Sequence, residues 1–137
     1  MAPQEIPPLE INGKPPDLAG LTCDGLIRQS YVHKGELDVP AHAIYLLFAG
    51  IWHRLYFDYG IIFWRTQQER PEAWSVEEEG WGYPHSDLGA EAGVTGVRLD
   101  GYEMEPMPYG SKVIFRFANG RRIVVEDVND RTSYEVI

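Results

Sequence analysis

The sequence lacks the means to form an internal disulfide, because its 137 residues include a single cysteine, Cys23. A lone thiol fits a reducing compartment, which predicts a cytoplasmic location. The start, MAPQEIPPLE, lacks the basic region and the apolar run of a secretory signal. The longest apolar run, residues 43–52, has about half the length of a membrane-spanning helix, and charged residues follow it directly. We therefore expect a soluble protein without a membrane partner.

The sequence also lacks the short motifs that mark common catalytic and metal sites. Its four histidines lie in different segments and form no HxH, HxxH or HExxH pair, so zinc or iron ligation has no local support. His53 beside Arg54 would allow a general base, but strand alternation favours a half-buried His53 that faces Arg65. No G-x-S-x-G elbow, G-x-G-x-x-G fingerprint or P-loop is present. We predict no catalytic residue, metal or cofactor; enzymatic activity stays open, and a non-enzyme is favoured.

Basic residues are scarce, since 12 Lys and Arg stand against 21 Asp and Glu, giving a net charge of -9. Most of the excess acid lies in residues 67–106, which hold ten Asp or Glu and two Arg. Such a distribution repels phosphate backbones and steers basic molecules toward the protein. We therefore expect no nucleic-acid binding and suspect a basic protein partner. The alternative is that the acids only keep the protein soluble.

What the chain does have is an aromatic and aliphatic stretch, residues 43–66, interrupted by Gly50 and by Asp58-Tyr59-Gly60. Its composition and its glycines favour strands over one long helix. A three-residue hairpin loop at 58–60 would pair Leu55 with Phe63. That register predicts a core face of Leu55, Phe57, Ile61 and Phe63, and a second face of Trp52, Arg54, Tyr56, Ile62 and Trp64. A two-residue loop at Tyr59-Gly60 would shift the pairing by one and regroup both faces.

The other elements are predicted from turn formers and alternation. Residues 26–33 are expected to form a strand, 35–40 a connecting turn, and 94–102 a strand followed by a proline-containing connection at 105–108. Asn119-Gly120 predicts a tight two-residue turn that pairs Phe115 with Val124. Asn129-Asp130 predicts a turn into a last strand at 132–137.

Together these elements predict a mainly β protein, or an α+β protein with one or two short helices, in a single domain of residues 1–137. We expect a single curved antiparallel sheet, a sandwich or a partly open barrel of seven to nine strands. Five prolines make residues 1–20 an extended arm. Residues 67–93 form a long acidic insertion that contains aromatic residues. It should fold back on the sheet with Trp74 or Trp81 as an anchor, and a short helix is expected at 71–79.

The first functional hypothesis is a non-enzymatic interaction protein that binds a basic macromolecular partner through its acidic and aromatic region, residues 67–106. Such a protein would be similar to small acidic inhibitors and immunity proteins in its charge imbalance only, since no motif supports the comparison. The predicted contact residues are Trp74, Glu77, Glu78, Glu79, Trp81, Tyr83 and Asp87. Exposed sheet edges and an aromatic face also lead us to expect a homodimer.

The alternative hypothesis is a small-molecule-binding β protein, or a small enzyme, whose curved sheet encloses an aromatic pocket. Arg54 would hold an anionic group of the ligand. The predicted pocket residues are Tyr45, Trp52, Arg54, Tyr56 and Trp64. If neither hypothesis holds, the aromatic residues only form core and the acids only solvate the surface.

Overall fold

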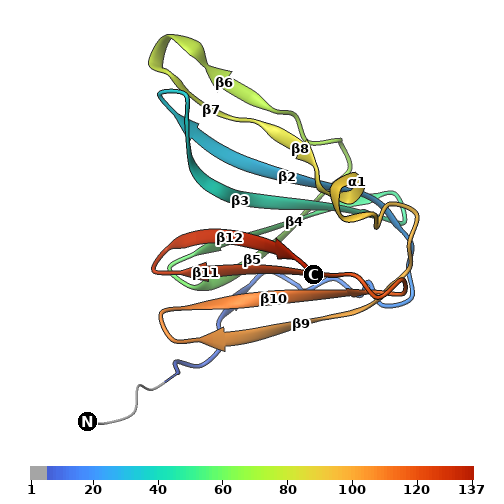
Figure 1. Cartoon of the computed structure of the whole chain (residues 1–137). Coiled ribbons are helices and arrows are strands. Elements are labelled where there is room, and N and C mark those ends of the chain that lie inside the picture. The colour runs from blue at the N-terminus through green and yellow to red at the C-terminus, as the bar shows by residue number, and fades with distance from the viewer. Residues whose placement is uncertain (1–5) are drawn as a thin grey trace.

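Two β-sheets lie face to face in the computed structural model, which describes residues 6–137 (Figure 1). The strands of the larger sheet are β1 (Ile11–Asn12), β2 (Cys23–His33), β3 (Glu36–Phe48), β4 (Ile51–Asp58), β5 (Ile61–Gln67), β6 (Trp74–Val76), β7 (Trp81–Tyr83) and β8 (His85–Asp87). Their order across the sheet is β1-β5-β4-β3-β2-β7-β6, and β8 also pairs with β2. All of these pairs are antiparallel except β1 with β5.

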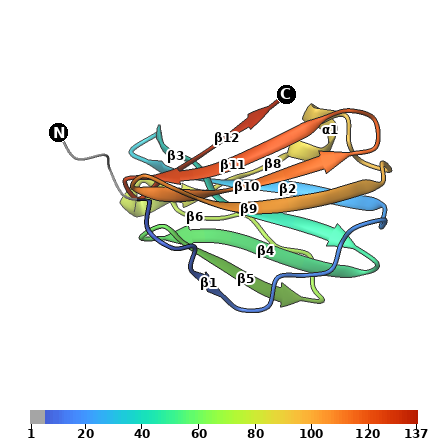
Figure 2. The same cartoon turned by 90° about the horizontal axis from the view of Figure 1, so that it is seen from below.

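The smaller sheet contains β9 (Leu99–Met107), β10 (Gly110–Phe117), β11 (Arg122–Val128) and β12 (Arg131–Val136). These strands follow one another as an antiparallel meander in the order β12-β11-β10-β9. Figure 2 shows the two sheets as stacked layers. The path from one sheet to the other runs through a short helix, α1 (Leu88–Ala92).

The main core lies between the two sheets. Alternation along each strand sends every second side chain into this layer. The buried residues from the larger sheet include Ile44, Leu46, Phe48, Leu55, Ile62 and Trp64, and those from the smaller sheet include Val113, Phe115, Phe117, Ile123 and Val125. Each fully buried aliphatic or aromatic side chain contributes about 1.5–3 kcal/mol of hydrophobic stabilisation. The sandwich therefore depends on this shared layer.

The prediction of a mainly β fold is confirmed, and of the three arrangements the sandwich is the one present. Eight strands have six residues or more, within the expected seven to nine, while β1, β6, β7 and β8 have two or three each. The helical elements within residues 6–137 are α1 and a 3-10 turn, η1 (Glu77–Glu79). Over the same range, no helix combines the length and the apolar character needed to cross a membrane.

The three-residue register predicted for the 58–60 hairpin is wrong, and the alternative two-residue loop at Tyr59-Gly60 is the one present. β4 and β5 are joined by the two-residue loop Tyr59-Gly60, so that Leu55 pairs with Trp64 and not with Phe63. Both loop residues have positive φ, 50° and 77°, as a tight primed turn requires. The pairing shifts by one residue, and the two faces regroup. Leu55, Ile62 and Trp64 lie in the main core with Phe57 packed against it, and Phe63 stacks on Tyr56 outside it.

A neighbouring turn explains why Tyr59 accepts a left-handed conformation. Its backbone N–H donates a hydrogen bond to Asp130 Oδ1 at 3.1 Å, and the N–H of Gly60 donates to Asp127 Oδ2 at 3.2 Å. A bulky residue at positive φ is uncommon because its side chain crowds the backbone. Contacts with the β11–β12 turn, about 70 residues away, offset that cost.

The tight turn predicted at Asn119-Gly120 is also wrong. The loop has three residues, 118–120. Phe115 therefore pairs with Ile123 and not with the predicted partner, Val124. Only Gly120 has a positive φ, 87°. The Asn119 side chain accepts a hydrogen bond from the backbone N–H two residues later and donates one to the Gly93 carbonyl. Its amide thus connects the turn to the end of α1.

Two prolines lie inside strands where turns were expected. Residues 36–40 of the turn predicted at 35–40 belong to β3 and only Gly35 lies in a turn, while Pro40 sits beside an irregularity in the pairing of β3 with β2. The predicted connection at 105–108 is largely strand, with Pro106 inside β9. Proline is tolerated in sheets at bulges and on edge strands, and β9 is an edge strand.

Two further segments differ from expectation. The helix expected at 71–79 is absent, because residues 74–76 pair as β6 and only 77–79 form a helical turn. The strand expected at 94–102 begins at Leu99, since α1 and a turn occupy the preceding residues. The predicted strand at 26–33 and the turn at Asn129-Asp130 are confirmed.

The described part of the N-terminal arm, residues 6–20, lies along the larger sheet. β1 pairs in parallel with β5, and Leu18 is buried in the main core. The hydroxyl of Tyr102 donates a hydrogen bond to the Pro16 carbonyl, which connects the arm to the smaller sheet. Residues 1–5 of the predicted arm lie outside the described residues.

Three turns meet around Asp127, whose side chain is buried. Its carboxylate accepts hydrogen bonds from the Gly60 N–H and from the Thr132 hydroxyl, at 3.2 and 3.1 Å. Ser111 closes the contact by donating its hydroxyl to the Gly60 carbonyl at 2.7 Å. Burial raises the pKa of Asp127; the Thr132 hydrogen bond opposes this rise, and two nearby carboxylates add to it.

We expect the Asp127→Asn variant to become more stable relative to the native protein as pH rises. The pKa of Asp127 is raised in the folded state, so its protonated form adds to the free energy of unfolding. This contribution is fully present below the ordinary pKa of 3.8 and is lost as pH rises through the folded-state pKa. Urea unfolding of both proteins between about pH 4 and about pH 7 measures the difference in unfolding free energy. A difference that stays constant over this range would contradict the expectation.

The chain crosses the outer face of the larger sheet between β5 and β6. β5 lies near one edge and β6 forms the other, with β4, β3, β2 and β7 between them. Residues 68–73 make this connection, in which Pro71 is buried and the Arg70 guanidinium lies 5.9 Å from the Trp52 ring centroid. Under the crossing lies a second, smaller buried cluster of Ile27, Ala43, Tyr45 and Trp52. The candidate site lies on this outer face.

Candidate functional site

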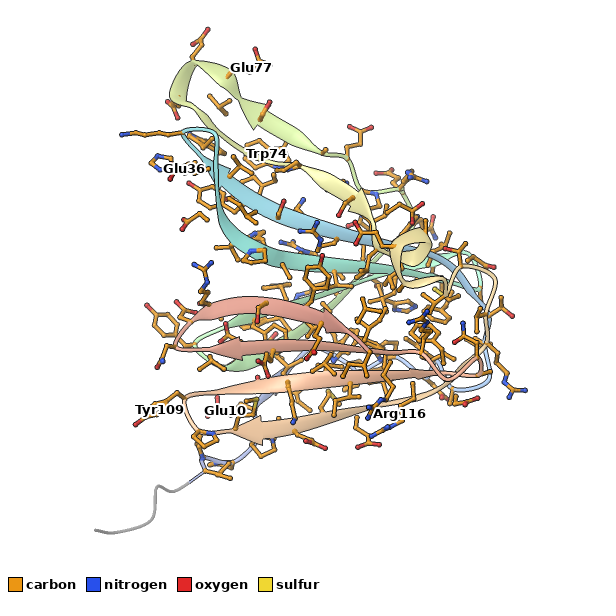
Figure 3. The ribbon with its side chains drawn as sticks, viewed as in Figure 1. Glu10, Glu36, Trp74, Glu77, Tyr109 and Arg116 are labelled. Carbon is orange, nitrogen blue, oxygen red and sulfur yellow. The ribbon has the colours of Figure 1, made fainter. Side chains whose placement is uncertain are left out.

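An acidic hairpin of β6, η1 and β7 occupies the free edge of the larger sheet. Gly80 ends its turn in the left-handed conformation at φ 74°, which glycine adopts without steric cost. The side chains of Glu77, Glu78 and Glu79 are exposed, and Figure 3 shows Glu77 near the tip of the hairpin, at the same end of the sheet as Glu36, the first residue of β3. Among the described residues, no Lys or Arg forms an ion pair with these three glutamates.

Three aromatic rings contact one another beside these glutamates, and we call Trp74, Trp81 and Tyr83 the hairpin aromatic cluster. The Trp74 ring centroid lies 5.0 Å from that of Trp81 and 4.9 Å from that of Tyr83. The indole N–H of Trp81 donates a hydrogen bond to Glu79 Oε2 at 2.7 Å, which orients that carboxylate. Trp74 keeps 51% of its surface exposed. A large apolar ring therefore faces solvent next to three carboxylates.

The insertion folds back on the sheet as expected, but backbone pairing holds it. β7 pairs with β2 at Val32 and His33, and β8 pairs with β2 at 27–29. The exposure of Trp74 rules it out as a buried anchor, and Trp81 is half-buried. The rings are thus left at the surface.

The structure does not bring Asp87 to this hairpin. Asp87 pairs with Ile27, whereas Gly82 of the hairpin pairs with Val32, five residues further along β2. Asp87 is the N-cap of α1, and its side chain accepts a hydrogen bond from the Ala90 N–H at 3.0 Å. Its role is to satisfy a free N–H at the start of the helix.

Four of the five predicted pocket residues lie together on the outer face of the larger sheet. The Arg54 guanidinium stands 4.5 Å from the Tyr56 ring centroid and 5.9 Å from that of Tyr45. Trp52 lies on the same face, buried in the smaller cluster. Trp64 does not join them, because the two-residue turn directs its side chain into the main core, where its N–H donates to the Met104 sulfur.

A hollow on the outer face joins residues from both predicted sets. Its volume is about 370 Å³, and it contains Tyr45 and Arg54 from one set and Trp74 and Tyr83 from the other. The remaining lining residues are Gln29, His42, Gln67, Pro71 and Glu72. Six segments contribute to it: the strands β2, β3, β4 and β5, the crossing segment, and the acidic hairpin.

Aromatic rings at and next to the hollow contact one another in pairs. The His42 ring centroid lies 4.8 Å from that of Tyr83, and the Tyr45 centroid lies 5.9 Å from that of His85. His85 Nε2 shares a 3.0 Å hydrogen bond with the Gln29 amide. Burial lowers the pKa of both histidines; Arg54 lowers that of His42 further, and Arg70 that of His85. Both imidazoles are thus favoured in the neutral form, beside a positive charge.

Sequence reasoning missed the contributions of Gln29, His42, Gln67, Glu72 and His85. One signal was present, because alternation along residues 27–33 sets Ile27, Gln29, Tyr31 and His33 on one face. No local pattern indicated that residues 68–73 cross over that face. Among the described residues, no group of three or more His, Cys, Asp or Glu side chains is arranged to hold a metal ion.

A second hollow, of about 510 Å³, lies beside the acidic hairpin. It is bordered by Val32, Ala73 and Pro84, together with residues of the hairpin itself. Hairpin and hollow together form an apolar and acidic surface at one sheet edge.

Comparison of the chain with protein-family models, with curated proteins and with solved structures gives no match. The geometry described above is therefore the basis for its function.

Proposed function

We propose that the protein is a non-enzymatic interaction module that binds a basic segment of a partner protein at the acidic hairpin. The observation that carries this proposal is the union of three exposed glutamates and three contacting aromatic rings on one hairpin at an open sheet edge. The wider 67–106 region does not act as a unit in this proposal, because Asp87 caps α1.

The hairpin offers two kinds of attraction to lysine and arginine side chains. The carboxylates of Glu77 and Glu78 make no hydrogen bond or ion pair with other described side chains, so they are open to a cationic partner. An exposed ion pair contributes about 0.2–1 kcal/mol. A cation over an exposed ring such as Trp74 contributes about 0.5–1 kcal/mol more. Charge and aromatic contact therefore select the same chemical class of partner.

The position of β6 supports the same reading. β6 is the last strand of the larger sheet and pairs with β7 alone, so one side of its backbone has no strand partner within residues 6–137. An extended segment of another protein can add to such an edge through main-chain hydrogen bonds. The same edge would serve a homodimer, which size-exclusion chromatography at several concentrations distinguishes from capture of a different protein.

The proposal includes a cytoplasmic location. It is supported by the state of Cys23, which is buried and unpaired; burial raises the pKa of its thiol to about 11. A thiol held in this neutral form reacts slowly and is compatible with a reducing compartment.

The double variant Glu77→Gln, Glu78→Gln is expected to weaken binding of a lysine-rich peptide by roughly 2- to 30-fold, the sum of two exposed ion pairs. Fluorescence of the exposed Trp74 reports the titration. The matched control is Glu91→Gln, Glu135→Gln, which removes two exposed acids elsewhere and changes the net charge equally. Equal weakening by both double variants would mean that only overall charge matters. Binding that is indifferent to added salt would also overturn the proposal.

A further inference from the structure

The hollow under the crossing segment is chemically different from the acidic hairpin beside it. We propose that this hollow binds a small organic anion with a planar ring, whose anionic group pairs with Arg54 and whose ring lies against Tyr83 and Trp74. This inference does not depend on the proposed capture of a basic partner. It uses the same two rings, which line both hollows, and a charge of the opposite sign.

Arg54 is the first reason. Neither an ion pair nor a hydrogen bond reaches its guanidinium from the described residues, and its Nε is buried without a partner. The arginine ion pairs within residues 6–137 belong to Arg98 and Arg116. The protein carries 21 acids, yet none of those that the structure describes forms an ion pair with Arg54. A planar guanidinium without an internal partner is suited to a carboxylate or phosphate from a ligand.

The orientation of Arg54 is the second reason. Its guanidinium lies against the rings of Tyr56 and Tyr45, at 4.5 and 5.9 Å from their centroids. Stacking of this kind holds the side chain in place before a ligand arrives. A ligand would therefore meet an arginine whose position is already restricted.

The walls of the hollow supply the contacts for a ring. Tyr83 lies between two other rings of the lining. Its ring centroid is 4.8 Å from that of His42 and 4.9 Å from that of Trp74. The amides of Gln29 and Gln67 also line the hollow, and each amide nitrogen already bonds within the protein, to His85 Nε2 and to the Glu69 carbonyl. A volume of about 370 Å³ falls within the range of small-molecule sites. Of the nine described lining residues, three are Tyr or Trp and five are polar or charged, so the hollow suits a ligand that carries both a ring and a charged group.

The local charge also favours an anion, although the whole protein is acidic. Burial lowers the pKa of His42 and of His85, and the charge of Arg54 lowers that of His42 further, as the charge of Arg70 does for His85. A further positive charge is therefore disfavoured at both imidazoles. Arg54 lines the hollow itself, and Arg70, which precedes the lining residue Pro71, has its guanidinium 5.9 Å from the Trp52 ring centroid. Glu72 is the one acidic side chain in the lining, and it opposes an anion. Arg54 and Glu72 thus give two variants with opposite expected effects.

Benzoate and its uncharged analogue benzamide test the proposal, with binding followed by NMR chemical-shift changes of the tryptophan indole N–H groups. We expect saturable benzoate binding below about 10 mM and at least about tenfold weaker binding of benzamide. Arg54→Gln should weaken benzoate at least about tenfold, and Arg54→Lys should weaken it less because the charge remains. Glu72→Gln should bind benzoate as tightly as the native protein or more tightly.

The controls separate this site from the hairpin and from misfolding. Arg98→Gln removes an exposed arginine outside the hollow and should leave benzoate affinity unchanged. The Glu77→Gln, Glu78→Gln variant should also bind benzoate normally while it loses the basic peptide. Circular dichroism tests whether Arg54→Gln is folded. If that variant does not fold, the benzoate affinity of Arg54→Lys tests the role of Arg54 instead. Equal affinity for benzoate and benzamide, undiminished affinity in Arg54→Gln, or no saturable binding would overturn the inference.

Discussion

Replacing Trp64 by alanine is expected to lower the free energy of unfolding by about 3–5 kcal/mol. Trp64 is 2% exposed and packs in the main core, where its ring centroid lies 5.4 Å from that of Tyr102. Its indole N–H donates to the Met104 sulfur at 3.4 Å. Truncation would leave a cavity between the two sheets, lined by side chains that cannot collapse fully. Urea unfolding followed by far-ultraviolet circular dichroism measures the loss.

The neighbouring residue supplies the control. Phe63 lies on the outer face, half-buried and stacked on Tyr56 with ring centroids 4.8 Å apart. Phe63→Ala should cost about 1–2 kcal/mol, because it removes an aromatic pair at the surface without opening a core cavity. A three-residue turn would place Phe63 in the core and Trp64 outside it. If Phe63→Ala proved the more destabilising variant, the two-residue register would be wrong.

Replacing Gly110 by alanine is expected to cost at least about 3 kcal/mol or to prevent folding. Gly110 is the first residue of β10 and pairs with Met107 on one side and Val128 on the other. A Cβ at this position would lie 1.6 Å from the Asp127 carbonyl oxygen and 2.7 Å from its carbonyl carbon. These are backbone atoms of a paired strand, so they cannot move away without separating β10 from β11. Thermal unfolding monitored by circular dichroism tests the expectation.

Gly101→Ala is the matched control within the same sheet. Gly101 lies in β9, has no positive φ, and a Cβ there would meet no atom within 4 Å. The alanine should be neutral or should stabilise by about 0.4–1 kcal/mol, since it restricts the unfolded chain. Equal losses from the two variants would show that the close approach of Asp127 to Gly110 is not the cause.

The two proposed binding surfaces share rings but not charges. Trp74 and Tyr83 face both the acidic hairpin and the hollow, so a change at either ring would affect both. Charge variants separate the surfaces, because Glu77 and Glu78 attract cations and Arg54 attracts anions. The experiments above therefore use glutamate and arginine variants and leave the rings intact.

Both hairpin loops were predicted with the wrong length, in opposite directions. Asp58-Tyr59-Gly60 was expected to use three residues and uses two; Asn119-Gly120 was expected to use two and belongs to a loop of three. In each case glycine marks the turn correctly, but the conformation of the residue before it decides the length. Tyr59 is held at positive φ by the β11–β12 turn, whereas the Asn119 amide bonds to the Gly93 carbonyl. Neither contact is visible in the local sequence.

Local patterning was sufficient for the mainly β character and for the approximate positions of most long strands. Alternation and turn-forming residues act over a few positions, so short windows of sequence contain them. The register, the inward direction of Trp64 and the assembly of the outer hollow depended on segments far apart in the chain. A shift of one residue in a turn exchanges the faces of a strand, and the crossing of residues 68–73 brings Arg54 and Trp74 to one hollow. Such arrangements follow from packing between sheets and turns, which only the folded chain brings into contact.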